Sequence, residues 1–151
     1  MNIFDNLKRF KAKEFPSQKE IDMTDPHLFK TLDEYAIDLG YPVHPSKAKG
    51  ALARDYGNSG SRHYADGRLS TACDFFPDCS ILRAFFMACH YFGGVGLYFD
   101  THFRKRQWIM LHGDLRNHQR IWWRKNRIYY TVNTNADYWK LINLIKRESI
   151  G

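Results

Sequence analysis

The segment QWIMLHGDLR, residues 107–116, alternates between two kinds of side chain, and this alternation constrains the fold more than any other stretch. A period of two is typical of a β-strand that is buried on one face. The core face would carry Ile109, Leu111 and Leu115. The opposite face would carry Trp108, Met110, His112, Asp114 and Arg116. The pattern therefore predicts a strand from which His112 and Asp114 project the same way, roughly 6.5–7 Å apart.

Three other segments carry apolar residues at helical spacing. The expected helices run over residues 24–40, 77–94 and 135–149. Thr24 or Asp25 can cap the first helix and Gly40 can end it. The second is expected to begin near Asp78 and to stop at two glycines. Its predicted buried stripe consists of Ile81, Leu82, Phe85, Phe86 and Cys89.

Short extended segments lie between these helices. The expected strands run over residues 70–76, 94–100 and 107–116, followed by a hairpin of 120–124 and 127–132. Residues 41–47 contain two prolines, which favour an edge strand or a loop. Residues 49–68 are rich in Gly, Ser, Asn and Asp and predict an irregular surface loop. This order predicts one domain over residues 1–151 of the α+β class, with a small antiparallel sheet and flanking helices.

Composition narrows the class of protein but not its partner. The chain has 151 residues, 44% of them hydrophobic, which is enough for a folded core. No apolar run approaches the roughly 20 residues that span a bilayer, and the charged N-terminus predicts a chain made in the cytoplasm without a signal peptide. Three cysteines without paired spacing are expected to be reduced. The net charge of +7 suggests an anionic partner, which could be nucleic acid, a membrane surface or a cell-wall polymer.

The stretch SRHYADGRLSTACDFFP, residues 61–77, places a histidine and an aspartate at the two ends of a run of small residues. Asp74 directly precedes Phe75 and Phe76, where burial of a carboxylate is costly unless a cation pairs with it. A metal ion would serve, and so would an arginine. The alternative is a solvent-exposed His63 and an aspartate that binds backbone amides.

His63 and Asp74, taken together with His112 and Asp114, give two imidazoles and two carboxylates. A catalytic zinc takes three nitrogen or oxygen ligands from the protein and keeps a fourth position for water. Three ligands and one further carboxylate match what metal-assisted hydrolysis requires.

These residues carry a family resemblance. The pattern S-x-H, then Gly, Ala and Asp, with H-x-D on a later strand, resembles the zinc D-alanyl-D-alanine carboxypeptidases and endolysin peptidases, whose fold is shared with the Hedgehog signalling domain. The matching residues are Ser61, His63, Gly67, Ala72, Asp74, His112 and Asp114. The stretch GVGLYFD and a helix ending in LG-YP also look like these proteins, so the resemblance extends from about Leu32 to the last helix. It is closest to the short versions encoded by phages and prophages.

The resemblance implies roles for individual residues. His63, Asp74 and His112 would be the zinc ligands. Asp114 would be the general base, a partner that orients a ligand, or only an ion-pair partner of Arg116. Arginine suits the carboxylates of peptidoglycan stem peptides because its planar fork binds carboxylate in bidentate fashion. The candidate substrate-binding residues are Ser61, Arg54, Arg62, Arg68 and Arg116, of which Arg54 looks like the family's upstream arginine.

The sequence departs from the family pattern in two places. Asp74 follows His63 by 11 residues, which is longer than the compact motif, so residues 65–70 would have to bulge as a loop. Many relatives carry an acidic residue or a histidine shortly before the last ligand. Here residues 108–111 are Trp, Ile, Met and Leu, and none of them can act as a base.

The function that the resemblance implies is a zinc-dependent peptidoglycan peptidase, acting as a D-Ala-D-Ala carboxypeptidase or as an endopeptidase. Such a chain would act as a monomer at the bacterial cell wall or in the phage particle. One alternative is an inactive member of the fold with a structural or wall-binding role. Another is a basic nucleic-acid-binding domain, which no recognised motif supports. Four aromatic residues of the hairpin could stack on a sugar or base, but their alternation favours packing in the core. They are Trp122, Trp123, Tyr129 and Tyr130.

Overall fold

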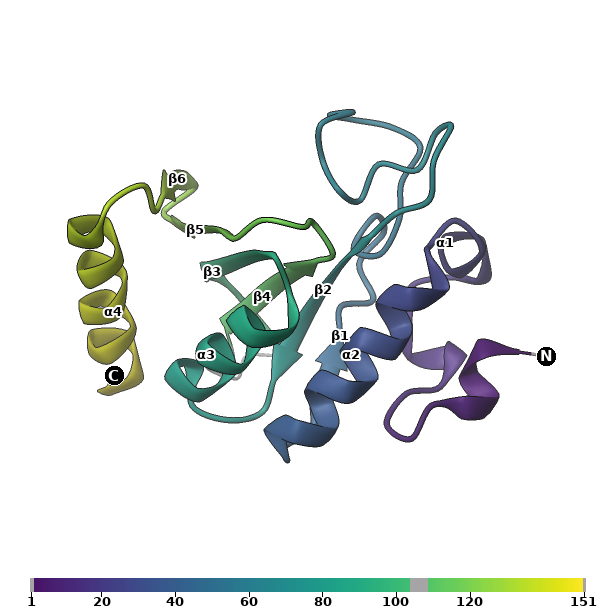
Figure 1. Cartoon of the computed structure of the whole chain (residues 1–151), viewed down its shortest axis with the longest axis horizontal. Coiled ribbons are helices and arrows are strands. Elements are labelled where there is room, and N and C mark those ends of the chain that lie inside the picture. Colours follow the sequence, from purple (N-terminus) through teal and green to yellow (C-terminus); the bar gives the residue numbers. More distant parts are fainter. Residues whose placement is uncertain (1, 104–108, 151) are drawn as a thin grey trace.

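Across residues 2–103 and 109–150, which the computed structural model describes, a six-stranded sheet and four α-helices form the fold (Figure 1). The strands are β1 (Val43–Pro45), β2 (Ala72–Pro77), β3 (Gly94–His102), β4 (Ile109–Asp114), β5 (Arg120–Lys125) and β6 (Ile128–Thr131). The helices are α1 (Gln18–Asp22), α2 (Pro26–Leu39), α3 (Ile81–Tyr91) and α4 (Asn135–Ile150). The predicted α+β class is confirmed.

The strand order is β1-β2-β4-β3-β5-β6, so β1 is an edge strand, as its prolines predict. Neighbouring strands are antiparallel except β3 and β5, which run parallel. The chain reverses after β3 and again after β4, and β5 then pairs with the free edge of β3. The expectation of a wholly antiparallel sheet is wrong at this pair, because a series of reversals does not reveal which neighbour a strand selects. Strand β3 extends to His102, two residues beyond the expected end at residue 100, and residues 104–108, including Trp108, lie outside the described residues.

The helix ends follow local signals. Asp25 caps α2 by accepting a hydrogen bond from the His27 backbone N–H at 2.9 Å, and Gly40 ends the helix with a left-handed φ of 75°. Ser80, not Asp78, caps α3, accepting from the Arg83 backbone N–H at 3.3 Å. The α3 stripe was also partly mispredicted. Its buried residues are Ile81, Ala84, Phe85 and Ala88, whereas Phe86 is 49% exposed.

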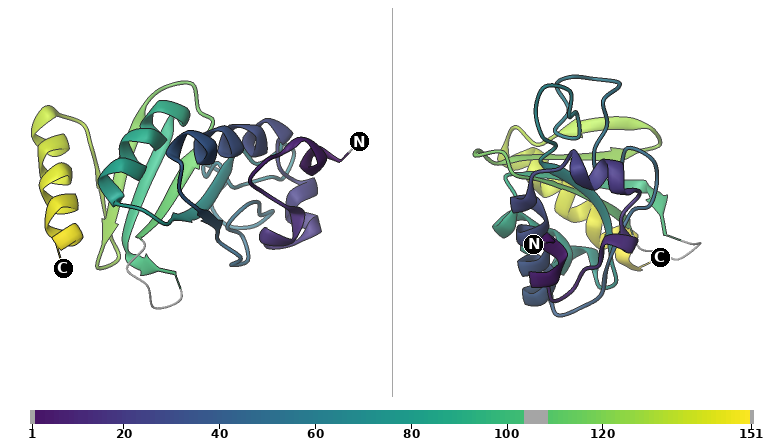
Figure 2. Two further views of the ribbon diagram at one scale, coloured as in Figure 1. Left: turned by 90° about the horizontal axis from the view of Figure 1, so that it is seen from below. Right: turned by 90° about the vertical axis from the view of Figure 1, so that its right-hand side faces the viewer.

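The hydrophobic core lies between the sheet and one layer of helices. Helices α2 and α3 lie side by side on one face of the sheet, and α4 packs against α3 (Figures 1 and 2). Tyr35 of α2 lies 5.3 Å from the Phe75 ring of β2 and donates a hydrogen bond to the Ala84 carbonyl at 3.2 Å. Leu97 and Leu111 are fully buried beneath the helices. Because side chains alternate along a strand, the residues next to Leu97 in β3 and next to Leu111 in β4 face the opposite side of the sheet.

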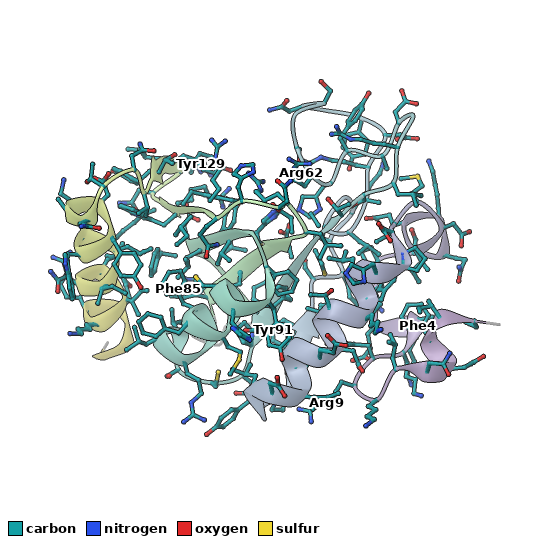
Figure 3. All side chains as sticks on the ribbon, viewed as in Figure 1. Phe4, Arg9, Arg62, Phe85, Tyr91 and Tyr129 are labelled. Atoms are coloured by element: carbon teal, nitrogen blue, oxygen red, sulfur yellow. The ribbon has the colours of Figure 1, made fainter. Side chains whose placement is uncertain are left out.

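The N-terminal segment, for which the sequence offered no clear expectation, packs against α2 through aromatic rings. The Phe4 and Phe15 rings each lie 5.1 Å from the Phe29 ring, and Figure 3 shows Phe4 beside the N-terminal end of this segment. The Asp33 carboxylate accepts hydrogen bonds from the backbone N–H groups of Lys8 and Arg9 at 3.1 and 2.7 Å. This segment therefore belongs to the core.

The predicted hairpin of β5 and β6 is confirmed, with Asn126 and Arg127 at the turn in left-handed backbone conformations, φ 51° and 66°. The prediction that its aromatics pack in the core is only partly correct. Trp123 is buried, but Tyr129 and Tyr130 are 60% and 43% exposed. The aromatic side chains of β6 therefore remain exposed to solvent.

The three cysteines are free thiols, which agrees with the expectation that they are reduced. Within the described part of the chain, no helix combines the length and the apolar character needed to cross a bilayer.

Candidate metal centre

Three side chains from two distant segments converge on one point. The His63 Nε2 atom lies 3.2 Å from Asp74 Oδ1 and 3.0 Å from His112 Nδ1. The third side of the triangle, between His112 Nδ1 and Asp74 Oδ1, is 3.1 Å long. The predicted convergence of these three residues is confirmed, and the group could hold a metal ion.

The sheet and one loop position the three ligands. Asp74 of β2 and His112 of β4 are direct partners in the antiparallel register, so their side chains lie side by side on the face away from the helices. His63 comes from the loop between β1 and β2, which rises beyond the end of the sheet in Figure 1. The His63 carbonyl accepts a hydrogen bond from the Arg54 backbone N–H at 2.9 Å. The expectation of a surface loop is wrong here, since residues 50–53 and His63 are buried.

The geometry fits a tetrahedral cation. Ligand atoms about 2.0–2.1 Å from a tetrahedral zinc lie about 3.3 Å from one another. The observed separations of 3.0–3.2 Å need only a slight expansion to reach this value. Both histidines are at least 95% buried, whereas the Asp74 side chain is 16% exposed and marks the side open to solvent.

The charges around the triangle favour a positive charge at its centre. Burial alone would lower the pKa of His112, but hydrogen bonds to Asp114 and Asp74 raise this pKa to about 9. Burial alone would raise the pKa of Asp74, but the charges and hydrogen bonds of His63 and His112 hold it well below its usual range. The site therefore stabilises a cation, which a proton or a metal ion can provide.

Each histidine has its second ring nitrogen fixed by an acceptor. The His63 Nδ1–H donates to the Leu52 carbonyl at 3.2 Å. The His112 Nε2–H donates to Asp114 Oδ2 at 2.8 Å. Each ring therefore turns its other nitrogen toward the centre, where that nitrogen can bind a metal ion once it has lost its proton. This arrangement is a further reason why the group could hold a metal ion.

Asp114 lies behind His112, on the side of the ring away from the centre. Its carboxylate is fully buried and accepts from Arg116 Nε and a terminal guanidinium nitrogen, both at 2.7 Å. This position matches two of the predicted roles, that of orienting a ligand and that of pairing with Arg116. A base acting on metal-bound water would have to lie on the Nδ1 side of the His112 ring.

Two glycines of β3 provide the space in which the site is built. A Cβ atom on Gly94 would lie 2.2 Å from Asp114 Oδ2, and one on Gly96 would lie 2.6 Å from the Trp122 ring. With these positions empty, Trp122 reaches across β3 and its ring lies 5.0 Å from that of His112. The stretch GVGLYFD therefore contributes small residues that let its neighbours lie over the strand.

A cleft of about 560 Å³ opens over the candidate metal centre. Four of the predicted substrate-binding residues line it, namely Ser61, Arg54, Arg62 and Arg116. Arg54 donates a hydrogen bond to the Ser61 hydroxyl at 3.1 Å. Arg68 does not line the cleft. Its guanidinium instead donates to the carbonyl oxygens of Tyr64, Ser59 and Ser61, so Arg68 braces the loop.

Sequence reasoning missed several residues of the cleft wall. Tyr98, Arg124 and Tyr129 occupy neighbouring register positions on β3, β5 and β6, and all three line the cleft. Arg124 pairs with Asp100 at 2.9 Å and lies 4.8 Å from the Tyr98 ring centre. Burial raises the pKa of Tyr98, which keeps its hydroxyl protonated. Alternation along β5 and β6 could have predicted that Arg124 and Tyr129 share one face of the hairpin. It could not have predicted that this face lies near His112.

No protein-family model, curated protein or solved structure matches the chain. The family resemblance therefore stays a prediction that rests on the residues of the site.

Proposed function

We propose that this chain is a zinc-dependent hydrolase of the Hedgehog/DD-peptidase fold that cleaves the stem peptides of peptidoglycan. One observation carries the proposal. His63 and His112 each turn one ring nitrogen toward the Asp74 carboxylate, while Leu52 and Asp114 hold the other ring nitrogen of each histidine. This is the ligand set and the supporting set that a catalytic zinc uses.

Each part of the cleft has a chemical task in this proposal. A bound zinc ion would lower the pKa of a water molecule and polarise the scissile carbonyl. The open side next to Asp74 would admit the substrate. The protonated hydroxyl of Tyr98 can donate a hydrogen bond to an oxygen that gains charge during the reaction.

The arginines favour a substrate with carboxylate groups. Arg116 and Arg124 already pair with Asp114 and Asp100. Arg54 and Arg62 also line the cleft, and neither has a carboxylate partner among the described residues. Figure 3 shows Arg62 at the side of the molecule where the loop meets the sheet. These two guanidinium groups can bind the carboxylates that stem peptides carry.

The proposed setting is a phage or prophage protein. It acts as a monomer on the bacterial cell wall or as part of the phage particle. The net charge of +7 would favour association with an anionic wall.

A specific observation supports one competing function, an inactive member of the same fold with a structural or wall-binding role. Among the described residues, the only carboxylate that lines the cleft is Asp74, which is itself a ligand. Asp114 has both oxygens engaged by His112 and Arg116. Hydrolysis would then depend on proton transfer through water or through a group supplied by the substrate.

Zinc content and wall degradation test both candidates. The purified chain should bind about one zinc ion, lose wall-degrading activity in a chelator and regain it when zinc is restored. His63→Ala should abolish activity, whereas His118→Ala, which removes an exposed histidine outside the cleft, should retain it. A zinc-loaded chain that leaves every type of peptidoglycan intact would exclude the peptidase and favour the inactive alternative. Salt-sensitive DNA binding that survives His63→Ala would instead favour the nucleic-acid reading.

A further inference from the structure

A second pocket of about 380 Å³ adjoins the metal cleft on the side of β5 and β6. It shares Ser61, Arg116, Trp122 and Tyr129 with the cleft and adds Arg120 and Thr131, among others. We call it the side pocket. The shared lining residues place the side pocket directly beside the cleft. Figure 3 shows Arg62 and Tyr129 along the same side of the molecule, on the loop and on β6.

The side pocket combines positive charge with aromatic surface. The Arg120 side chain is exposed and has no carboxylate partner among the described residues. The Arg116 guanidinium lies 5.3 Å from the Trp122 ring centre, and Tyr129 is 60% exposed. No Asp or Glu lines this pocket. An unpaired guanidinium beside neutral aromatic rings is suited to bind a ligand that carries a carboxylate on a short apolar chain.

The strand register sets the distance from the metal centre. Gly96 pairs with His112 on one side, and Gly94, two residues earlier, pairs with Arg120 on the other side. Two strand spacings of about 4.8 Å and one two-residue step of about 6.7 Å separate His112 and Arg120 by about 12 Å. An extended peptide covers this distance with about three to four residues.

We propose that the side pocket binds a second carboxylate of the peptide substrate, held by Arg120, while Arg54 and Arg62 bind the carboxylate nearer the metal. The inference rests on the proposed function, since it concerns the substrate of the adjoining cleft. It assigns Arg120 a role in specificity, namely a preference for stem peptides with a free acidic side arm over peptides in which that arm is amidated.

A matched pair of stem peptides tests the assignment, one with a free carboxylate on the side arm and one with the carboxamide. Calorimetric titration into the metal-free full-length chain measures binding without turnover. The wild type should bind the free acid about tenfold more tightly, since a charge-assisted hydrogen bond is lost on amidation. Arg120→Gln should bind both peptides equally. Arg127→Gln removes the same charge from the same hairpin outside either cavity, and should keep the preference.

Equal affinity of the wild type for the two peptides would overturn the proposal and would favour a neutral sugar or peptide arm on Trp122 and Tyr129. A preference that survives Arg120→Gln would also overturn it. Turnover by the zinc-loaded chain is measured separately on the same peptides. Absence of cleavage with a retained binding preference would reject the peptidase function alone, whereas cleavage with no preference would reject the role of Arg120 alone.

Discussion

Glu20 of α1 and Leu52 lie 32 positions apart in the chain, yet Glu20 Oε1 accepts a hydrogen bond from the Leu52 backbone N–H at 3.2 Å. The same carboxylate accepts from the backbone N–H groups of Ala53 at 3.0 Å and Gly50 at 3.2 Å. Residues 50–53 in turn contact two of the three candidate ligands, His63 and Asp74. The Leu52 carbonyl accepts from His63 Nδ1, and the Ala51 carbonyl accepts from the backbone N–H of Asp74 at 3.0 Å.

Glu20→Ala should therefore weaken both the fold and the metal centre. Three buried backbone donors would lose their acceptor, and we expect the free energy of unfolding to fall by about 3 kcal/mol. Because His63 would lose its fixed orientation, zinc affinity should fall about 10–100-fold. Glu20→Gln keeps one acceptor oxygen and should have an intermediate effect.

Chemical denaturation and competition with a zinc chelator measure the two effects. Glu34→Ala, which removes an exposed carboxylate from α2, is the matched control and should change neither quantity. A Glu20→Ala chain with wild-type zinc affinity would contradict the link between α1 and the metal centre.

Asp114→Asn tests whether the carboxylate behind His112 supports the metal. The neutral amide would polarise His112 less and would leave the Arg116 guanidinium without its charge partner. We expect zinc affinity to fall about 10–100-fold and the free energy of unfolding to fall by about 3 kcal/mol, because the pair is buried.

The Asp100–Arg124 pair provides the comparison for this experiment. Asp100→Asn removes a carboxylate from an arginine pair at 2.9 Å that does not touch a candidate ligand. It should lower stability and leave zinc affinity intact. If Asp114→Asn and Asp100→Asn have the same effect on zinc affinity, Asp114 does not orient His112 for metal binding.

Gly96→Ala should displace the Trp122 ring, which lines the cleft. The new methyl group would lie 2.6 Å from the Trp122 ring, which must then move away from His112. Overpacking of this kind costs about 1–3 kcal/mol of stability. The double variant Gly96→Ala with Trp122→Leu makes room for the methyl group and should recover part of this loss. Thermal unfolding measures both variants, and a double variant less stable than the sum of the single changes would contradict direct contact as the cause.

Alternation along single strands made part of the site predictable. It placed His112 and Asp114 on one face, and the position of Asp74 before two phenylalanines indicated a buried carboxylate that needs a cation. The pairing of Asp74 with His112 across β2 and β4 depends on register, which no single strand reveals. Likewise, only the folded chain shows that Asp114 binds the nitrogen on the far side of the His112 ring.

The remaining differences arise from long-range contacts. His63 sits in an irregular loop, so no periodicity could bring it to the sheet; the buried segment 50–53 and Glu20 do so. Arg68 carries the same charge as Arg62, but it binds the carbonyl oxygens of its own loop. Phe86 fits a helical stripe on α3 and is nevertheless 49% exposed, because α3 buries its small residues against its neighbours.

Above pH 6.5 the stability of the metal-free chain should fall as the pH rises, whereas the stability of the zinc-bound chain should change little. In the metal-free chain the pKa of His112 is raised to about 9 from an ordinary value of 6.5. Protonated His112 therefore contributes stability that is fully present below pH 6.5 and is lost as the pH rises through about 9, in total about 3 kcal/mol. The lowered pKa values of Asp74 and Asp114 contribute stability above their ordinary values, and this is lost as the pH falls below about 4.

Zinc must displace the proton from His112, so zinc affinity should rise about tenfold per pH unit between pH 6.5 and 9. The increase in Tm on adding zinc should consequently be larger at pH 8.5 than at pH 6.5, even though the metal-free chain is less stable at the higher pH. Thermal unfolding with and without zinc at a series of pH values measures both trends. In His112→Gln the metal-free slope above pH 6.5 should flatten, since the group that titrates there is gone. A metal-free wild-type chain that gains stability between pH 7 and 9 would show that His112 does not hold the proton, and that the centre is not assembled around a positive charge.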